Sequence, residues 1–160
     1  MEPRLLTEHA ESEIDREIAK YPPERKQAAV MAALSIAQRE KGWLSEATLG
    51  YVARRLEIPP IQVTEVATFY SMYDLAPVGR HKISLCTNIS CMLRGSDSIA
   101  EYLENKLNIK PGQTTGDGKF TLKEVECLAA CGGAPMMQVD ENYYENLTPQ
   151  RVDEILDGME

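Results

Sequence analysis

The sequence predicts an α+β protein in which an N-terminal helical bundle is followed by a mixed sheet covered by helices. Apolar residues recur at helical spacing through roughly the first seventy positions, whereas apolar and polar residues alternate from Lys82 onward. Between these patterns lies a turn-rich segment, DLAPVG, at residues 74–79. We therefore expect a helical region over residues 1–78 and a sheet-containing domain over residues 79–160.

The first two helices are predicted from their start and stop signals. Ser12 followed by Asp15 has the spacing of a capping box, which predicts the start of a short first helix. Pro23 is suited to the first turn of a second helix, and Gly42 is suited to its end. The apolar positions between Pro23 and Gly42 fall on one side of that helix.

Two more helices complete the predicted bundle. Ser45 is a good N-cap for the third helix, and Leu44 and Leu49 have the spacing of a hydrophobic staple. The pair Pro59-Pro60 restarts the pattern for a fourth helix. Its apolar stripe consists of Val63, Val66, Ala67 and Tyr70. The helical spacing continues into Phe69 and Met72, which we expect in the core, while Tyr70 and Tyr73 are expected to face a partner or the cysteine loops.

The second half of the chain predicts four strands and two helices, in the order β-α-β-β-β-α. Two runs with strand-like composition and alternation are followed by a hairpin signal, and Thr148-Pro149 is a strong N-cap and first-turn pair. The predicted strands are residues 82–86, 120–127, 137–140 and 143–145, and the helices begin at Ser98 and Thr148. This order predicts a helix-covered mixed sheet.

Composition excludes several classes of function. The formal net charge of −8 argues against a nucleic-acid partner, because binding phosphates requires an excess of Lys and Arg. No apolar run approaches the roughly 20 residues of a membrane span, so direct membrane insertion is not expected. The acidic N-terminus does not resemble a secretory signal, which favours a cytoplasmic location. The sequence has no dinucleotide or triphosphate fingerprint and no Ser-His-Asp set, so we expect no catalytic site on this chain alone.

All four cysteines occur in two tight pairs, Cys86 with Cys91 and Cys127 with Cys131, at the ends of the first two predicted strands. Disulfides would require an oxidising compartment, for which the N-terminus offers no route. A thioredoxin-type dithiol would require C-x-x-C, whereas the spacings here are C-x4-C and C-x3-C. A thiolate metal site fits better, because small residues surround the second pair and leave room for a metal.

The metal itself is left open by the spacing. Structural zinc sites usually show shorter C-x2-C knuckles, and four thiolates in two pairs suit a [2Fe–2S] cluster with one iron per pair. Iron–sulfur is modestly favoured over zinc on this ground. A Rieske centre is not expected, because His9 and His81 do not pair with the cysteines.

Several separate motifs resemble one family, the small [2Fe–2S] subunit of NADH:quinone oxidoreductase, respiratory complex I. The resemblance runs from about Glu11 to Leu156 in matching order. The motifs are QVTEVATFYSMY at 62–73, CMLRG at 91–95, DGKFTL at 117–122 and ECLAACGGAP at 126–135. Related subunits serve NAD-linked hydrogenases and formate dehydrogenases, so these complexes are an alternative, and a zinc-stabilised docking subunit is a second one.

The resemblance implies a thioredoxin-like [2Fe–2S] ferredoxin domain behind the helices. Cys86 and Cys91 would bind one iron, and Cys127 and Cys131 the other. The cluster would exchange single electrons with FMN on the partner flavoprotein subunit, which also binds NADH. That subunit and the rest of the peripheral arm would hold the chain at the inner face of the bacterial cytoplasmic membrane. Ala129 stands where the family more often has Gly, which puts the hydrogen bonds to sulfur and the potential in question.

Overall fold

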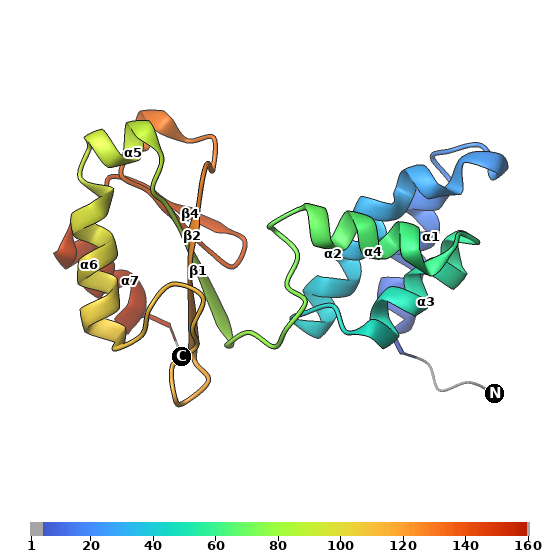
Figure 1. The fold of residues 1–160 in the computed structure, drawn as a ribbon, viewed down its shortest axis with the longest axis horizontal. Coiled ribbons are helices and arrows are strands. Elements are labelled where there is room, and N and C mark those ends of the chain that lie inside the picture. Colours follow the sequence, from blue (N-terminus) through green and yellow to red (C-terminus); the bar gives the residue numbers. More distant parts are fainter. Residues whose placement is uncertain (1–4, 160) are drawn as a thin grey trace. The chain divides into compact units, whose positions relative to one another are not determined.

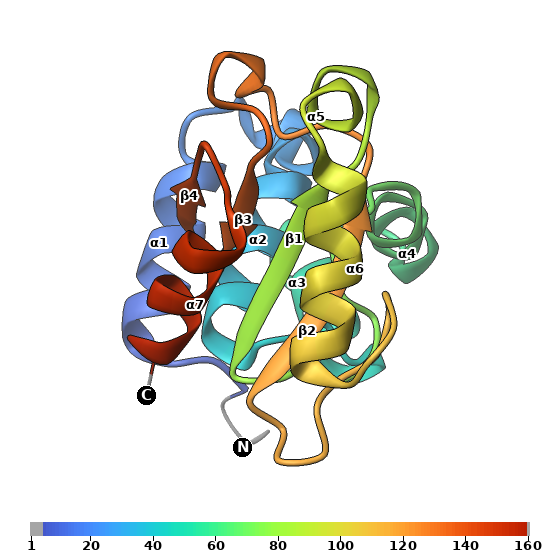
Figure 2. The same cartoon turned by 90° about the vertical axis from the view of Figure 1, so that its left-hand side faces the viewer.

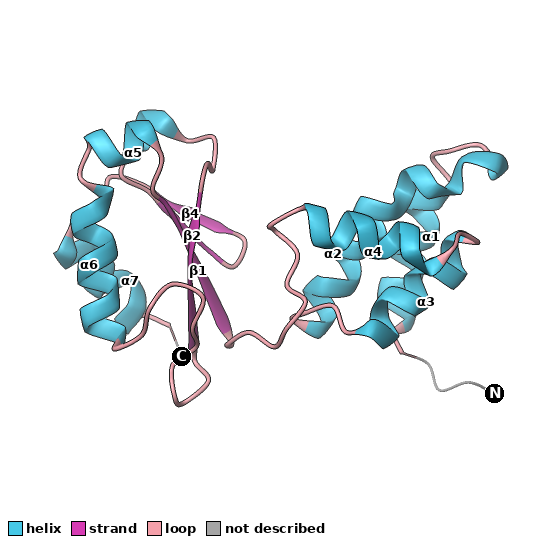
Figure 3. Ribbon diagram, in the orientation of Figure 1, coloured by secondary structure: helices cyan, strands magenta, loops and turns pink. Residues whose placement is uncertain are grey.

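The computed structural model describes residues 5–159, and the chain forms two compact units, residues 1–77 and 78–160. The described part of the first unit contains helices and loops only, whereas the second unit combines helices with a sheet (Figure 3). Within residues 5–159, no helix is both long and apolar enough to cross a lipid bilayer.

The first unit is a small bundle packed around one apolar core (Figure 1). Leu34, Val52 and Val63 lie at its centre and are almost completely buried. Its helices are α1 (Glu8–Ile18), the 3-10 helix η1 (Pro23–Ala29), α2 (Val30–Lys41), α3 (Glu46–Leu56) and α4 (Pro60–Phe69). The predicted helical bundle is present in this unit.

Helix α1 is capped by Thr7, more than one turn before the predicted capping box at Ser12, so that prediction was wrong. The Thr7 side-chain oxygen accepts a hydrogen bond from the Ala10 N–H at 3.3 Å and donates one to the Glu40 carboxylate at 2.7 Å. Glu40 belongs to α2, so a tertiary contact supports the earlier start. A local capping pattern carries no information about that contact.

The second predicted helix is divided. Pro23 opens η1, in which Arg25 departs from helical geometry with φ −122°, and the regular helix α2 starts only at Val30. The predicted end at Gly42 is confirmed, since Gly42 follows α2 with φ +80°. A residue with a Cβ would be strained in that conformation.

Helices α3 and α4 begin where their signals predict. The Ser45 side chain accepts a hydrogen bond from the Thr48 N–H at 3.2 Å, which satisfies one of the free donors at the start of α3. Pro60 occupies the first turn of α4, where its missing N–H costs no helical hydrogen bond.

The prediction that Phe69 and Met72 lie in the core was wrong. Phe69 is 79% exposed and Met72 is 48% exposed, so neither lies in the core. The helix ends at Phe69, and Tyr70 is extended, so the helical spacing that would bury Met72 stops. Tyr73 is buried instead, and its hydroxyl donates a hydrogen bond to the Met31 carbonyl at 2.9 Å.

The second unit is built on a four-stranded mixed sheet with the strand order β2-β1-β3-β4, and the mixed sheet agrees with the prediction. Strands β1 and β2 are parallel, and the pairs β1–β3 and β3–β4 are antiparallel. The strands are β1 (His81–Cys86), β2 (Phe120–Val125), β3 (Met137–Val139) and β4 (Asn142–Tyr144). The helices are α5 (Ile89–Leu93), α6 (Ser96–Leu107), the 3-10 helix η2 (Cys131–Gly133) and α7 (Pro149–Asp157).

Helices α6 and α7 lie on the same side of the sheet (Figure 1). Leu103 of α6 and Val152 of α7 pack with Ile83 of β1 in one apolar core. The two helices are also joined by polar contacts, since Asp153 accepts hydrogen bonds from the Tyr102 hydroxyl and the Lys106 ammonium, each at 2.7 Å. The loops at the ends of the strands are thereby held by a packed framework.

Candidate metal centre

The two cysteine pairs begin at or just after the C-terminal ends of β1 and β2. These ends lie at the same end of the sheet because the two strands are parallel. Cys86 is the last residue of β1, and Cys127 follows the end of β2 by two positions. Cys86 is directly opposite Val125 in the ladder, so both strands end together. The predicted position of the pairs, at the ends of the first two strands, is confirmed.

The second member of each pair lies on a short helical turn. Cys91 is in α5, and Cys131 is the first residue of η2. Figure 2 shows α5 and the turn near residue 131 at the same end of the sheet. Helix α5 was not predicted, because its five residues are too few to show helical periodicity.

The Cys91 thiol is buried, and its surroundings shift its pKa. Burial raises the pKa of the Cys91 thiol, and a hydrogen bond with Cys86 and the nearby Cys131 raise it further. A hydrogen bond from the Met136 backbone N–H acts in the opposite direction. Cys86 and Cys91 also pack with Ala134 and Met136, which lie between Cys131 and β3, in one small buried cluster.

Backbone geometry directs an amide toward Cys127. The Ala129 N–H donates a hydrogen bond to Cys127 Sγ at 3.2 Å, and Ala129 adopts a left-handed conformation with φ +57°. Few non-glycine residues adopt this conformation, and it costs about 1–3 kcal/mol when it occurs. Amide hydrogen bonds to cysteine sulfur stabilise the thiolate form that binds metals.

Asn88 ties the two cysteine loops together. Its side-chain oxygen accepts a hydrogen bond from the Ile89 N–H at 2.7 Å, and its amide nitrogen donates to the Glu126 carboxylate at 3.1 Å. Cys86 Sγ donates a hydrogen bond to the Glu126 carbonyl at 3.8 Å. No role for Asn88 was predicted, although Asn at the start of a helical turn is a recognisable cap signal.

The small residues after Cys131 have two different surroundings. A side chain at Gly132 would meet nothing within 4 Å, as expected for a loop that leaves space around the thiols. A Cβ at Gly133 would lie 2.6 Å from both Cβ and Cγ of Glu145. Gly133 is therefore required by close packing against Glu145, a reason that the sequence pattern does not reveal.

Four free thiols suit a metal centre with all-sulfur ligands. Cys86 and Cys91 are buried, whereas Cys127 and Cys131 are exposed, and none forms a disulfide. Thiolates favour soft metal centres, including iron–sulfur clusters. Among residues 5–159, no group of three or more His, Cys, Asp or Glu side chains is arranged closely enough to hold a single metal ion. The donor set and the amide hydrogen bond to Cys127 are compatible with a [2Fe–2S] cluster.

The two histidines have partners elsewhere. His81 opens β1, at the end opposite Cys86, and its Nδ1 lies 2.7 Å from the Asp140 carboxylate. His9 lies in α1, 3.8 Å from the Glu13 carboxylate. Both positions agree with the surface or packing role expected from the sequence.

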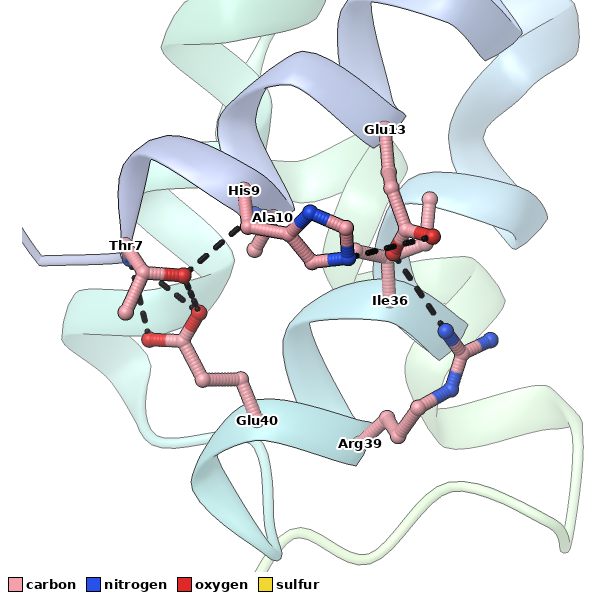
Figure 4. A pocket seen from close by; sticks show the side chains of 7 residues that line it. All are labelled: Thr7, His9, Ala10, Glu13, Ile36, Arg39 and Glu40. Atoms are coloured by element: carbon pink, nitrogen blue, oxygen red, sulfur yellow. Dashed lines mark hydrogen bonds and ion pairs between the residues drawn. The ribbon is translucent and has the colours of Figure 1, made fainter.

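A pocket of about 240 Å³ between α1 and α2 lies in the first unit (Figure 4). Its charged groups already have partners: Glu13 binds Arg39 at 3.3 Å, and Glu40 accepts hydrogen bonds from the backbone and the hydroxyl of Thr7. Burial acts to raise the pKa of Glu40, but the Thr7 hydrogen bonds and the neighbouring Lys41 lower it overall. The pocket is therefore part of the packing between α1 and α2.

A mixed four-stranded sheet with a pair of free thiols at or after the end of each of two parallel strands defines the chain as a protein suited to bind a metal centre through thiolates. The family model described as "Thioredoxin-like [2Fe-2S] ferredoxin" matches residues 14–160. The chain belongs to this family.

Two relatives agree with this assignment, and each is named as a subunit of NADH-quinone oxidoreductase. The chain is 48% identical over 143 residues to the relative from Rickettsia bellii (strain RML369-C), covering 89% of this chain and 86% of that protein. It is 46% identical over 146 residues to the relative from Rhizobium meliloti (strain 1021), covering 91% and 86%.

A solved structure shares the fold. The crystal structure of an NAD+-reducing [NiFe]-hydrogenase in the air-oxidized state matches with a TM-score of 0.67 at 20% identity. The match covers 78% of this chain but only 22% of the hydrogenase chain. At this identity, the likeness extends to the fold alone.

Proposed function

We propose that this chain is the electron-carrying subunit of an NADH-quinone oxidoreductase and that it holds one [2Fe–2S] cluster. The observation that carries the proposal is that one thiol pair begins at or just after the end of each of two neighbouring parallel strands, in a chain of the thioredoxin-like [2Fe–2S] family. The names of the relatives, which the chain matches over most of their length, support the same complex.

Each cysteine pair would hold one iron. Cys86 and Cys91 form the buried pair, and Cys127 and Cys131 form the exposed pair. When bound, the cluster supplies one-electron chemistry, at a potential that a net negative protein charge lowers. The chain itself contributes thiolates, the Ala129 amide at Cys127, and a rigid framework that fixes the ligand loops.

The partner in this proposal is the flavoprotein subunit, which would carry FMN and bind NADH. Supporting it is the apolar surface of α5, directly beside Cys91: Ile89, Met92 and Leu93 are 62%, 44% and 76% exposed. Exposed apolar residues that adjoin a redox centre suit burial in a protein interface, which would also bring the electron donor close. We further propose that the complex holds this chain in the cytoplasm, at the inner face of the cytoplasmic membrane.

The test is anaerobic purification of the chain, with assays for iron, zinc and sulfide and with EPR spectra before and after reduction. We expect two irons and two sulfides per chain and a spin-half signal only after reduction. Cys131→Ser should reduce cluster content or alter the spectrum, whereas Ser90→Ala, beside Cys91, should leave both unchanged. A colourless protein with one zinc would refute the electron-carrier assignment in favour of a structural docking subunit.

The partner requires a second measurement. Affinity purification of the tagged chain from its native host, followed by activity assays, should recover NADH oxidation coupled to quinone reduction. Recovery of hydrogen- or formate-dependent NAD reduction would instead assign the same cluster protein to an NAD-linked hydrogenase or formate dehydrogenase.

A further inference from the structure

Glu145 lies directly over the segment that follows Cys131. A Cβ at Gly133 would lie 2.6 Å from both Cβ and Cγ of Glu145 and would also collide with its carboxyl carbon. The whole Glu145 side chain is therefore laid along Gly133, which is itself buried. This glutamate comes from the chain after β4, more than ten positions from the cysteine loop.

Three hydrogen bonds fix the backbone that carries Glu145. The Asn146 N–H donates to the Gly133 carbonyl at 2.7 Å, and the Leu147 N–H donates to the Pro135 carbonyl at 2.9 Å. The Arg151 Nε donates to the backbone carbonyl of Glu145 at 3.1 Å. These bonds hold the backbone of Glu145 next to the cysteine loop, while its side chain reaches solvent.

The carboxylate is close enough to influence a charge held by Cys131. Consecutive Cα atoms are about 3.8 Å apart, so the Glu145 carboxyl carbon lies within about 12 Å of the Cys131 Cα. Arg151 Nε donates to the backbone carbonyl of Glu145, and the structure shows no ion pair between Arg151 and the Glu145 carboxylate within the described residues.

We propose that Glu145 lowers the reduction potential of the centre ligated by Cys131, because a negative charge held beside the cysteine loop opposes the arrival of an electron. This inference rests on the proposed [2Fe–2S] cluster and adds a residue that sets its potential. Two unit charges about 12 Å apart at an effective dielectric constant of about 20 change an equilibrium constant about tenfold. At an ionic strength of about 0.01 M, where the Debye length is about 30 Å, about a fivefold effect remains, whereas screening in physiological salt, with a Debye length of about 8 Å, reduces it to less than about twofold.

The experiment is an EPR-monitored redox titration of the intact, cluster-loaded chain and of Glu145→Gln, which keeps the shape and removes the charge. At a fixed ambient potential near the midpoint and an ionic strength of about 0.01 M, the ratio of reduced to oxidised cluster should rise about three- to tenfold, and in physiological salt the change should fall below about twofold. A tenfold change corresponds to about 59 mV for a one-electron couple.

Glu154→Gln is the matched control, since it removes the same charge from α7, in the part of that helix next to Gly158. It should change the ratio less than twofold. Equal effects of the two variants would mean that only net charge matters and would overturn the proposal.

Glu145→Ala separates packing from charge. If it lowered cluster content while Glu145→Gln left the potential unchanged, the role of Glu145 would be purely structural and the proposal would be wrong. A wild-type chain that held no [2Fe–2S] cluster would instead refute the proposed function, an outcome that the iron and sulfide assays identify before any titration.

Discussion

Replacing Gly133 with Ala tests whether the chain after β4 closes onto the cysteine loop as the structure has it. The new methyl group would lie 2.6 Å from both Cβ and Cγ of Glu145, well inside van der Waals contact. The Glu145 Cβ is attached directly to the backbone, so rotation of the side chain cannot relieve the whole collision. The Asn146 N–H bond to the Gly133 carbonyl, 2.7 Å long, would be stretched as the chain moved away.

The expected cost follows from the size of the collision. Overpacking a well-packed site by one methyl group typically costs about 1–3 kcal/mol. For a domain of this size, each kcal/mol lowers the melting temperature by about 4–8 °C. Gly133→Ala should therefore lower the melting temperature of the C-terminal unit by roughly 4 to 24 °C. Far-UV circular dichroism and the loss of the visible cluster absorbance would both measure this change.

Gly132 supplies the control, since the same methyl group there would meet nothing within 4 Å. Gly132→Ala should be neutral or slightly stabilising, because it reduces the freedom of the unfolded chain. Combining Gly133→Ala with Glu145→Gly should restore most of the lost stability. If the two alanine variants melted at the same temperature, the close packing of Glu145 on Gly133 would be refuted.

Two other contacts yield direct predictions. Tyr73→Phe removes the hydroxyl that binds the Met31 carbonyl and should lower the free energy of unfolding by about 1 kcal/mol, measured by urea denaturation; no change would mean that solvent replaces the contact. The hydrogen bond from Lys106 lowers the pKa of Asp153 in the folded state, with a further contribution from the Tyr102 hydroxyl. Its stabilising effect should be fully present above the unfolded pKa of about 3.9 and be lost as the pH falls through the lower folded pKa. Asp153→Asn should therefore reduce the loss of stability on acidification, and an unaltered pH profile of unfolding would contradict this.

Local signals predicted the elements whose boundaries depend on nearby residues. Ser45 caps α3 through its own side chain, and Gly42 ends α2 with a positive φ, so both boundaries were accessible to the sequence. The start of α1 carried a similar local signal, since Thr7 accepts a hydrogen bond from the Ala10 N–H, but the Ser12 spacing predicted a later start. Periodicity likewise failed for Met72, since it gave no warning that α4 ends at Phe69.

The cysteine pairs were predictable because strand alternation placed each pair at a strand end, and a parallel ladder aligns those ends. The contacts that order the loops were less accessible. Asn88 bonds to Glu126, and Glu145 covers Gly133, across long separations in the chain. Neither contact produces a periodic or local pattern in the sequence, so both can be identified only from the structure.

The parallel pairing of β1 with β2 also has a consequence for biogenesis. Neither hairpin nor local turn brings Cys91 beside Cys131, because α6 and the loop before β2 intervene. Such crossover pairings form slowly, because closing a long chain segment costs conformational entropy before the contacts between the strands can offset it. A half-made chain on the ribosome thus exposes the first thiol pair without the second. For the proposed cluster, the complete set of four thiolate ligands would therefore come together only after β2 has paired with β1.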